Sequence, residues 1–268
     1  MVLSAFSPAR RRLVVFSVLI SIAALVAGGI WTAVARAGKT NAVTITQAEP
    51  GPVLLVPGYG GSVTGLQALA ARLRAAGKQV SIMSLPGNGT GDLREQAKAL
   101  RSAARSVLST SGASSLDVVG YSAGGVVARL WLSDYGGASV ARRIITLGTP
   151  NHGTQLADLG GVIAGACPLA CQQLAPNSSL LLALNRERPA AAPSLVSIWT
   201  TQDDVVLPPD SARLDGALDL TVQGICASSQ VQHGGLPTEP LVAGMVLAEL
   251  AAGAPVALTP ADCARLSS

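Results

Sequence analysis

A short glycine-flanked serine sequence, Gly120-Tyr121-Ser122-Ala123-Gly124, constrains the fold of this 268-residue chain more than any other stretch. It directly follows the apolar run LDVV and directly precedes VVARLWLSDYG, which we expect to form a helix. A GxSxG sequence at a strand-to-helix junction is typical of a nucleophile elbow, a strained turn whose flanking glycines let strand and helix approach closely. The turn places the serine hydroxyl at the positive end of the helix, where an oxyanion is stabilised. Ser122 is therefore the candidate nucleophile.

The rest of the chain supplies the sheet that such a turn needs. From Gly51 onward, short apolar runs alternate with helix-compatible segments, which predicts an α/β fold with a mostly parallel central sheet and helices on both faces. Segments 66–77 and 94–112 have apolar residues at three- and four-residue spacing and end at a glycine, so they predict helices. Strands are expected near residues 53–56, 80–84, 116–120, 143–147, 195–200 and 218–222.

The first residues of the chain predict export. Arg10-Arg11-Arg12 precedes an uncharged stretch, 13–35, and the small residues at 33, 35 and 37 suit signal peptidase. We expect residues 1–37 to be a signal peptide or, if uncleaved, a membrane anchor, because the stretch is long enough to cross roughly 30 Å of hydrocarbon. Residues 38–50 are expected to be a linker and 51–268 the folded domain. The protein is then secreted or, alternatively, anchored with its domain outside the cytoplasm.

The distribution of charge argues against one class of partner. Five of the 19 basic residues and none of the 15 acidic residues precede residue 49, which leaves 14 basic against 15 acidic groups in the body of the chain. A near-neutral body without zinc-finger spacing or an arginine-rich run argues against nucleic-acid binding. We expect a monomer that uses no cofactor and no metal.

Four cysteines lie beyond the export segment, where an even number favours disulfides. Three pairings are possible. We favour Cys167 with Cys171, a local link within CPLAC, and Cys226 with Cys263, which would tie the tail to the region after the last strand. The alternative is four buried free thiols, and a zinc site is less favoured because the chain has two histidines.

A serine nucleophile needs a base, and in this kind of fold the histidine comes last in the chain, after the acid. His233 lies in VQHGGLP, between the last strand and the terminal helix, and is the predicted base. The alternative is a histidine of a surface loop. His152 follows a strand too early in the chain, so we expect it to be structural or to lie at the rim of the site.

The acid is expected just after the strand near 195–200. Asp203 and Asp204 occur together there, and Asp203 is preferred, with Asp204 as the alternative. A carboxylate in this place would hold the imidazole in its productive tautomer. Asp210 and Asp215 lie farther along and are expected to have no catalytic role.

An oxyanion hole needs two backbone N–H donors. One belongs to the residue after the nucleophile, here Ala123, and the other to the loop after the first core strand. In LLVPGYGGS the glycines at 58, 60 and 61 let the backbone approach a substrate, which would direct the Tyr59 N–H to the developing charge. A glycine-rich turn without a ligand is the alternative. A phosphate loop is excluded because no GKS or GKT follows.

With these pieces the sequence resembles the small exported bacterial lipases of the α/β-hydrolase superfamily, of the class 2 type, and its LVPGYGG stretch is similar to a loop of the fungal lipase B group. The matching segments, between Pro52 and Leu250, are VPGYGGS, VVGYSAGG, ITLGTPNHGT, SIWTTQDDVV and VQHGGL. The resemblance implies a triad of Ser122, Asp203 and His233, with Tyr59 and Ala123 as oxyanion donors. The family's acid matches the first aspartate of TTQDD. Many relatives have His-Gly where this chain has Pro57-Gly58, so help from that histidine is absent.

The predicted activity is hydrolysis of a carboxylic ester through an acyl-enzyme, by a lipase or carboxylesterase. Segment 154–194, which the resemblance does not align, is expected to form a rim or lid-like insertion. Its apolar side chains suit a lipid-like ester and contact with a lipid interface, with buried core as the alternative for at least half of them: Leu156, Leu159, Val162, Ile163, Leu169, Leu174, Leu180, Leu181 and Leu182. Two other functions stay open, acyl transfer by the same triad and non-catalytic binding by a membrane-anchored protein.

Overall fold

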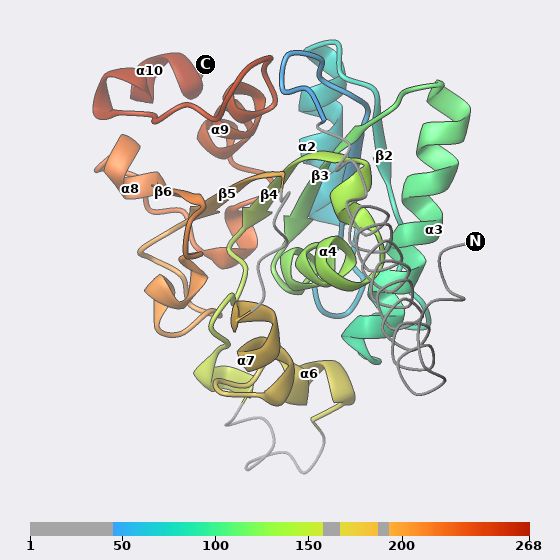
Figure 1. Cartoon of the computed structure of the whole chain (residues 1–268). Helices are drawn as coiled ribbons and strands as arrows, with labels where there is room; N and C mark the ends of the chain where they lie inside the picture. The colour runs from blue at the N-terminus through green and yellow to red at the C-terminus, as the bar shows by residue number, and fades with distance from the viewer. Residues whose placement is uncertain (1–44, 158–166, 187–192) are drawn as a thin grey trace, which may run out of the picture. The chain divides into compact units, whose positions relative to one another are not determined.

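A computed structural model of the protein describes residues 45–157, 167–186 and 193–268, and the predicted export segment lies outside them. Six strands form one sheet in the order β2-β1-β3-β4-β5-β6, and every neighbouring pair is parallel (Figure 1). The predicted parallel sheet is thus confirmed. The strands are β1 Val53–Val56, β2 Val80–Ile82, β3 Leu116–Tyr121, β4 Ala141–Leu147, β5 Ser194–Trp199 and β6 Leu218–Thr221.

The edge strand β2 ends two residues earlier than its apolar pattern predicts. Its last ladder bond runs from the Met83 N–H to the Leu55 carbonyl oxygen of β1, at 3.0 Å. The next donor on β1 would be residue 57, which is a proline and has no N–H. The predicted strand over 80–84 was therefore too long, because the partner strand has no donor to continue the pairing.

Helices cover both faces of the sheet, as predicted. Alternate strand residues face opposite layers, so Leu54 and Val56 pack in the cluster with α3 and α4, whereas Val53 and Leu55 pack in the cluster with α2 and α9. None of the described helices is both long and apolar enough to cross a bilayer. The helices are α2 Thr64–Ala75, α3 Leu93–Ser111, α4 Ala123–Asp134, α6 Leu169–Gln173, α7 Ser179–Arg186, α8 Val222–Ile225, α9 Pro240–Glu249 and α10 Cys263–Leu266, with 3₁₀ turns η2 Gly137–Ser139, η3 Pro209–Ala212, η4 His233–Gly235 and η5 Pro260–Asp262.

Both ends of helix α3 have residues that stop a helix for a known physical reason. The Asp92 side chain accepts a hydrogen bond from the Arg94 N–H at 2.9 Å and so caps the first turn. At the other end Gly112 adopts φ 71°, a left-handed conformation that glycine reaches without steric cost.

A buried charged cluster lies at the amino-terminal edge of the sheet. Asp117 of β3 accepts hydrogen bonds from Nε and Nη2 of Arg142 in β4, at 2.8 and 2.6 Å, and both side chains are buried. A register shift between Leu116 and Asp117 leaves Arg142 as the extra residue of a bulge. Arg142 and Arg143 also donate to backbone carbonyls within 249–253. These hydrogen bonds hold the segment after α9 against the edge of the sheet that lies opposite to Ser122.

Candidate active site

The candidate residues come together because each follows a strand of a parallel sheet, whose carboxyl ends share one edge. Tyr59 follows β1, Ser122 follows β3 and Asp203 follows β5. His233 opens the turn η4, beyond β6 and the short helix α8. Segments far apart in sequence therefore meet at one place.

The turn at Ser122 has the strained geometry of a nucleophile elbow. Ser122 adopts φ 54° and ψ −127°, and its N–H donates to the Leu147 carbonyl oxygen at 2.8 Å. A Cβ on Gly120 would lie 2.6 Å from the Gly124 carbonyl oxygen, and a Cβ on Gly124 would lie 2.4 Å from the Val56 carbonyl oxygen. Both glycines of GxSxG are thus required by close backbone approach.

His233 joins the serine to a carboxylate. Its Nε2 lies 3.0 Å from Ser122 Oγ and its Nδ1 lies 2.9 Å from Asp203 Oδ2. His233 and Asp203 are 5% and 4% exposed, so the chain of three groups is shielded from water on its acid side. The geometry has the serine–histidine–acid connectivity by which an imidazole accepts a hydroxyl proton.

The two neighbouring aspartates hold different parts of His233. Asp203 bonds the ring through Oδ2, while its Oδ1 accepts the N–H groups of Val205 and Val206 at 2.9 and 2.7 Å. Asp204 is exposed and accepts the His233 backbone N–H at 3.3 Å through Oδ1. The structure therefore brings Asp203 to the imidazole and Asp204 to the backbone of the same residue.

The other histidine belongs to a separate polar network. His152 is exposed, and its Nδ1 lies 3.3 Å from Asn185 Nδ2 of α7. Asn185 in turn accepts a bond from the buried Arg129 of α4 at 2.7 Å, and Arg129 also donates to Asn151 at 3.0 Å. Arg129 and Asn185 thus join α4 to α7, and His152 lies at the exposed end of this network. The exposed Asp210 and Asp215 lie farther along the same loop than Asp203.

The expected oxyanion loop lies against Ser122. A Cβ on Gly58 would come within 2.9 Å of Ser122 Cβ and 3.5 Å of Ser122 Oγ, so the backbone at Gly58 borders the serine. Tyr59, the next residue, is 44% exposed. Ala123 is the first residue of α4, where an N–H has no intrahelical acceptor and remains available to a ligand.

Two further residues shape the site and were missed in the sequence. The Tyr121 hydroxyl donates to the His233 carbonyl oxygen at 3.2 Å, and the two rings have centroids 5.3 Å apart. Burial raises the pKa of Tyr121 to about 12, and the charges of Asp203 and Asp204 act in the same direction, so the phenol stays a donor. Thr149 donates from Oγ1 to the Ser122 carbonyl oxygen at 2.8 Å and supports the elbow. Both residues lie inside the motifs GYSAG and LGTPNHGT, and this position was their only signal in the sequence.

A family profile described as alpha/beta hydrolase fold matches residues 51–163 of the chain. The chain has the α/β-hydrolase fold. The matched region holds the glycine-rich loop at 57–61 and the turn at Ser122, whereas Asp203 and His233 lie beyond it. A comparison with curated protein sequences finds no match.

Solved structures share this α/β-hydrolase fold at low identity. Aspergillus fumigatus lipase B is 21% identical with a TM-score of 0.70, over 84% of this chain and 58% of the lipase chain. This chain thus spans less than two thirds of that protein. The mature form of Bacillus licheniformis lipase BlEst2 is 20% identical with a TM-score of 0.55, over 65% of this chain and 84% of that chain. A structure described under the metagenome-derived lipolytic enzymes LipS and LipT is 16% identical with a TM-score of 0.56. The match covers 75% of this chain and 95% of that chain.

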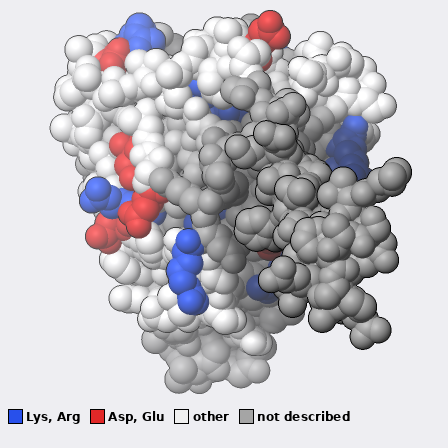
Figure 2. All heavy atoms as spheres, viewed as in Figure 1, with Lys and Arg blue, Asp and Glu red and all other residues white. Residues whose placement is uncertain are grey.

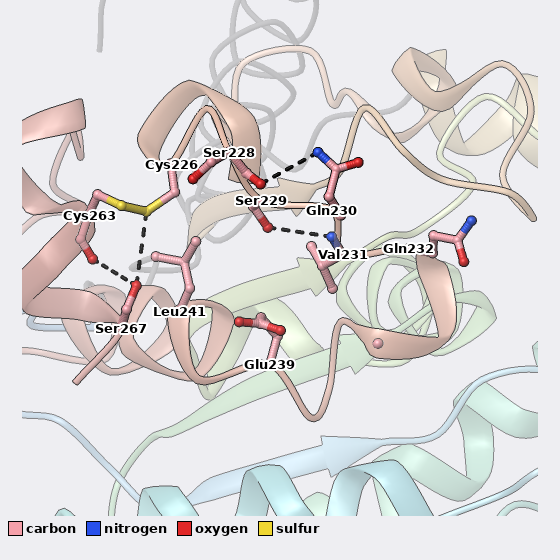
Figure 3. A pocket seen from close by; sticks show the side chains of 11 residues that line it. Cys226, Ser228, Ser229, Gln230, Val231, Gln232, Glu239, Leu241, Cys263 and Ser267 are labelled. Carbon is pink, nitrogen blue, oxygen red and sulfur yellow. Dashed lines mark hydrogen bonds between the residues drawn. A yellow bond between two sulfur atoms is a disulfide. The ribbon is translucent and has the colours of Figure 1, made fainter.

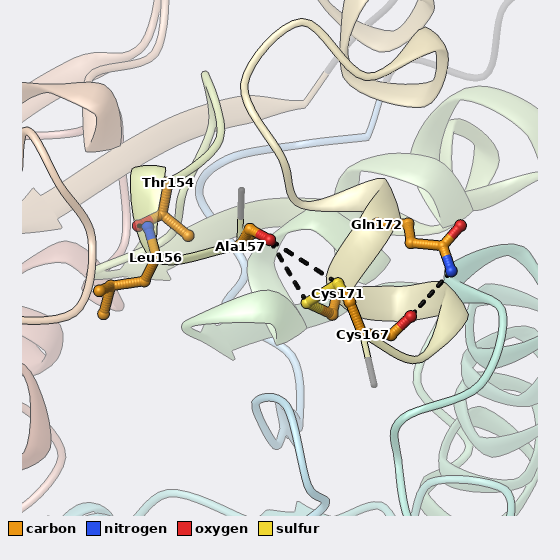
Figure 4. Close-up of a disulfide and its surroundings, with 6 residues drawn as sticks. All are labelled: Thr154, Leu156, Ala157, Cys167, Cys171 and Gln172. Carbon is orange, nitrogen blue, oxygen red and sulfur yellow. Dashed lines mark hydrogen bonds between the residues drawn. A yellow bond between two sulfur atoms is a disulfide. The ribbon is translucent and has the colours of Figure 1, made fainter. Parts of the chain in front are cut away.

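The insertion expected over 154–194 is described for residues 154–157, 167–186 and 193–194. The favoured disulfide Cys167–Cys171 is formed there, and both sulfur atoms lie 3.7 Å from the Ala157 carbonyl oxygen (Figure 4). Gln173 of α6 accepts the Leu93 N–H at 2.8 Å and so joins the insertion to the start of α3. This part of the insertion is therefore packed on the α/β-hydrolase core.

The apolar residues of the insertion divide between core and surface. Leu174, Leu180 and Leu181 are buried in the cluster with α3 and α4, so for these three the alternative of buried core is confirmed. The other described residues, Leu156, Leu169 and Leu182, are 40–45% exposed. Leu159, Val162 and Ile163 lie outside the described residues.

A pocket of about 530 Å³ lies beside the loop that carries His233, between segment 226–241 and the tail at 263–267, as Figure 3 shows. The favoured disulfide Cys226–Cys263 forms one wall, and Ser228, Ser229 and Glu239 contribute polar groups. The disulfide thus joins the tail to the segment that leads to His233. Among the described residues, no cluster of three or more His, Cys, Asp or Glu side chains is placed to hold a metal.

Proposed function

We propose that the chain is a serine hydrolase that cleaves carboxylic esters through an acyl-enzyme. The observation that carries the proposal is the chain of contacts from Ser122 Oγ through the two ring nitrogens of His233 to Asp203, at 3.0 and 2.9 Å. The strained elbow supports it, because such strain is retained where it holds a nucleophile in place.

Each residue of the site has its own part in the reaction. Ser122 Oγ attacks the ester carbonyl carbon while His233 Nε2 takes its proton, and Asp203 stabilises the imidazolium that forms. The N–H groups of Tyr59 and Ala123 hold the tetrahedral oxyanion. His233 then gives the proton to the leaving alcohol, which leaves the acyl group bound to Ser122 Oγ. A water molecule, activated by His233 in the same way, attacks this acyl-enzyme and releases the carboxylic acid product.

A lipid-like acyl ester is the substrate class that we propose. Leu156 and Val205 are 40% and 38% exposed, and they are adjacent because Thr154 accepts the Leu156 N–H and donates to the Val205 carbonyl oxygen. Val205 also donates its N–H to the acid Asp203, so this apolar surface borders the acid loop. In Figure 2 most of the described surface is uncharged, and acidic and basic side chains gather at its left side. The exposed apolar side chains of Leu156 and Val205 favour an apolar acyl chain over a charged substrate.

We also propose that the chain acts outside the cytoplasm, secreted or anchored, as its first residues predict. The two disulfides support this location, because such bonds persist in oxidising compartments. A monomer that contacts a lipid interface through the apolar surface remains our expectation.

Hydrolysis of a series of nitrophenyl esters, from acetyl to long acyl chains, tests the proposed function. We expect turnover that favours medium or long chains and is lost in Ser122→Ala. Ser81→Ala, which removes an exposed serine of β2, serves as the matched control and should keep full turnover. A sharp optimum at acetyl esters would argue against a lipid-like substrate, and turnover retained in Ser122→Ala would refute the mechanism.

A further inference from the structure

The backbone of His233 is held from both ends by side chains that adjoin the other two members of the triad. Tyr121 precedes the nucleophile Ser122, and its hydroxyl donates to the His233 carbonyl oxygen at 3.2 Å. Asp204 follows the acid Asp203, and its Oδ1 accepts the His233 N–H at 3.3 Å. The N–H and the carbonyl oxygen of His233 belong to the peptide groups on either side of its Cα, and each group is therefore tied to one of the two loops that the ring must bridge.

The geometry of the imidazole makes this tie consequential. The ring must keep one nitrogen 3.0 Å from Ser122 and the other 2.9 Å from Asp203, so a small rotation of the backbone lengthens one contact. His233 lies in a 3₁₀ turn of three residues, η4, which has little rigidity of its own. The Tyr121 ring lies beside the imidazole, with centroids 5.3 Å apart and planes tilted by 34°.

We propose that Tyr121 and Asp204 are positioning residues, which hold the His233 backbone so that its ring stays between Ser122 and Asp203. Tyr121 supplies a hydroxyl donor and Asp204 an oxygen acceptor, and neither touches the reacting atoms. The inference rests on the proposed function, since it concerns how the base of that triad is held.

The chemistry of each contact sets the size of its effect. The His233 carbonyl oxygen also accepts the Leu236 N–H at 3.2 Å, so removal of the Tyr121 hydroxyl loosens the carbonyl without freeing it. Loss of one such hydrogen bond corresponds to a fall in kcat of about three- to tenfold. Because the loss concerns the base and not substrate binding, KM stays unchanged.

The test compares Tyr121→Phe, Asp204→Ala and Asp204→Asn in the full chain by kcat, KM and their pH profiles. We expect a loss of about three- to tenfold in kcat for Tyr121→Phe and Asp204→Ala, equal at all pH values on the plateau. Asp204→Asn should recover most of the loss, because an amide oxygen still accepts the N–H. The matched controls are Tyr135→Phe, at the end of α4, and Asp210→Ala, an exposed aspartate of the same loop.

Three results would overturn the positioning role. One is wild-type kcat in both Tyr121→Phe and Asp204→Ala. Another is a loss in Asp204→Asn as large as in Asp204→Ala, because the carboxylate charge would then matter and not the acceptor. The third is a loss confined to the acid limb of the pH profile, which again indicates charge. Ser122→Ala distinguishes the two levels: if it is inactive while the other variants are fully active, the proposed function stands and the positioning role does not.

Discussion

Asp203 Oδ2 lies 2.9 Å from His233 Nδ1, and the second oxygen of the same carboxylate accepts two backbone N–H groups. The carboxylate is almost fully buried, so these bonds replace its contact with water. A buried and fully bonded acid holds the imidazole more rigidly than an exposed one. This difference separates Asp203 from Asp204, which the sequence places side by side.

Asp203→Asn is expected to lower kcat by about 10³- to 10⁴-fold, because an amide facing Nδ1 favours the unproductive tautomer of the histidine. Asp204→Asn keeps its acceptor and should lose far less. Steady-state kinetics of both variants against one ester decides between the two aspartates. Equal losses would contradict the assignment of Asp203 as the acid.

Gly124→Ala is expected to destabilise the fold by about 1–3 kcal/mol and to lower activity more than tenfold. The added Cβ would lie 2.4 Å from the Val56 carbonyl oxygen, and its displacement shifts the end of β1 that leads to the oxyanion loop. Chemical denaturation and ester turnover measure the two effects. The control is Gly91→Ala, where an added Cβ has no neighbour within 4 Å. A fully active Gly124→Ala would show that the close approach is not needed.

Arg142→Ala is expected to lower the free energy of unfolding by about 3–5 kcal/mol, because it leaves the buried Asp117 carboxylate without its partner. The matched control is Arg265→Ala, which breaks the exposed ion pair with Asp262 and should change stability little. Denaturant unfolding of the three proteins checks the contrast. Similar losses in both variants would contradict the importance of burial.

Alkaline titration tests the environment of Tyr121. Its pKa is raised from 10 to about 12, so the folded state resists deprotonation. The stability that this group contributes is fully present below pH 10 and is lost as the pH rises from about 10 to 12. The tyrosinate absorbance that disappears in Tyr121→Phe should therefore develop near pH 12, and not near pH 10. Development near pH 10 would mean that the phenol is not buried beside the two aspartates.

Local sequence patterns predict most of the strands and the elbow. The runs at 53–56 and 116–120 were predicted because strands that are buried on both faces appear as short continuous apolar runs between helix-compatible segments. The elbow was predicted because a glycine-flanked serine stands between such a run and a helix, and the structure shows that Gly120 and Gly124 allow close backbone approach there. The order of the chain also predicted His233 as the base, because a late histidine after the last strand has few alternatives, and the structure places its ring between Ser122 and Asp203.

Contacts that depend on tertiary structure could not be found in this way. The Asp117–Arg142 pair depends on a bulge in β4, and no residue type in the sequence predicts that bulge. The bond from Tyr121 to the His233 carbonyl joins residues 112 positions apart and involves a backbone atom that has no sequence signature. Residue type alone does not distinguish the buried leucines of α7 from leucines of an exposed acyl-binding surface. Only the tertiary structure shows which of them are buried.

Covalent labelling tests the central claim most directly. The wild-type chain and His233→Ala are treated with a fluorophosphonate, and the modified residue is located by peptide mass spectrometry. The proposed mechanism predicts one phosphonyl group on Ser122 Oγ in the wild type and a strongly reduced labelling rate in His233→Ala, because the hydroxyl loses its base. Labelling at another serine, or an unchanged rate in His233→Ala, would contradict it.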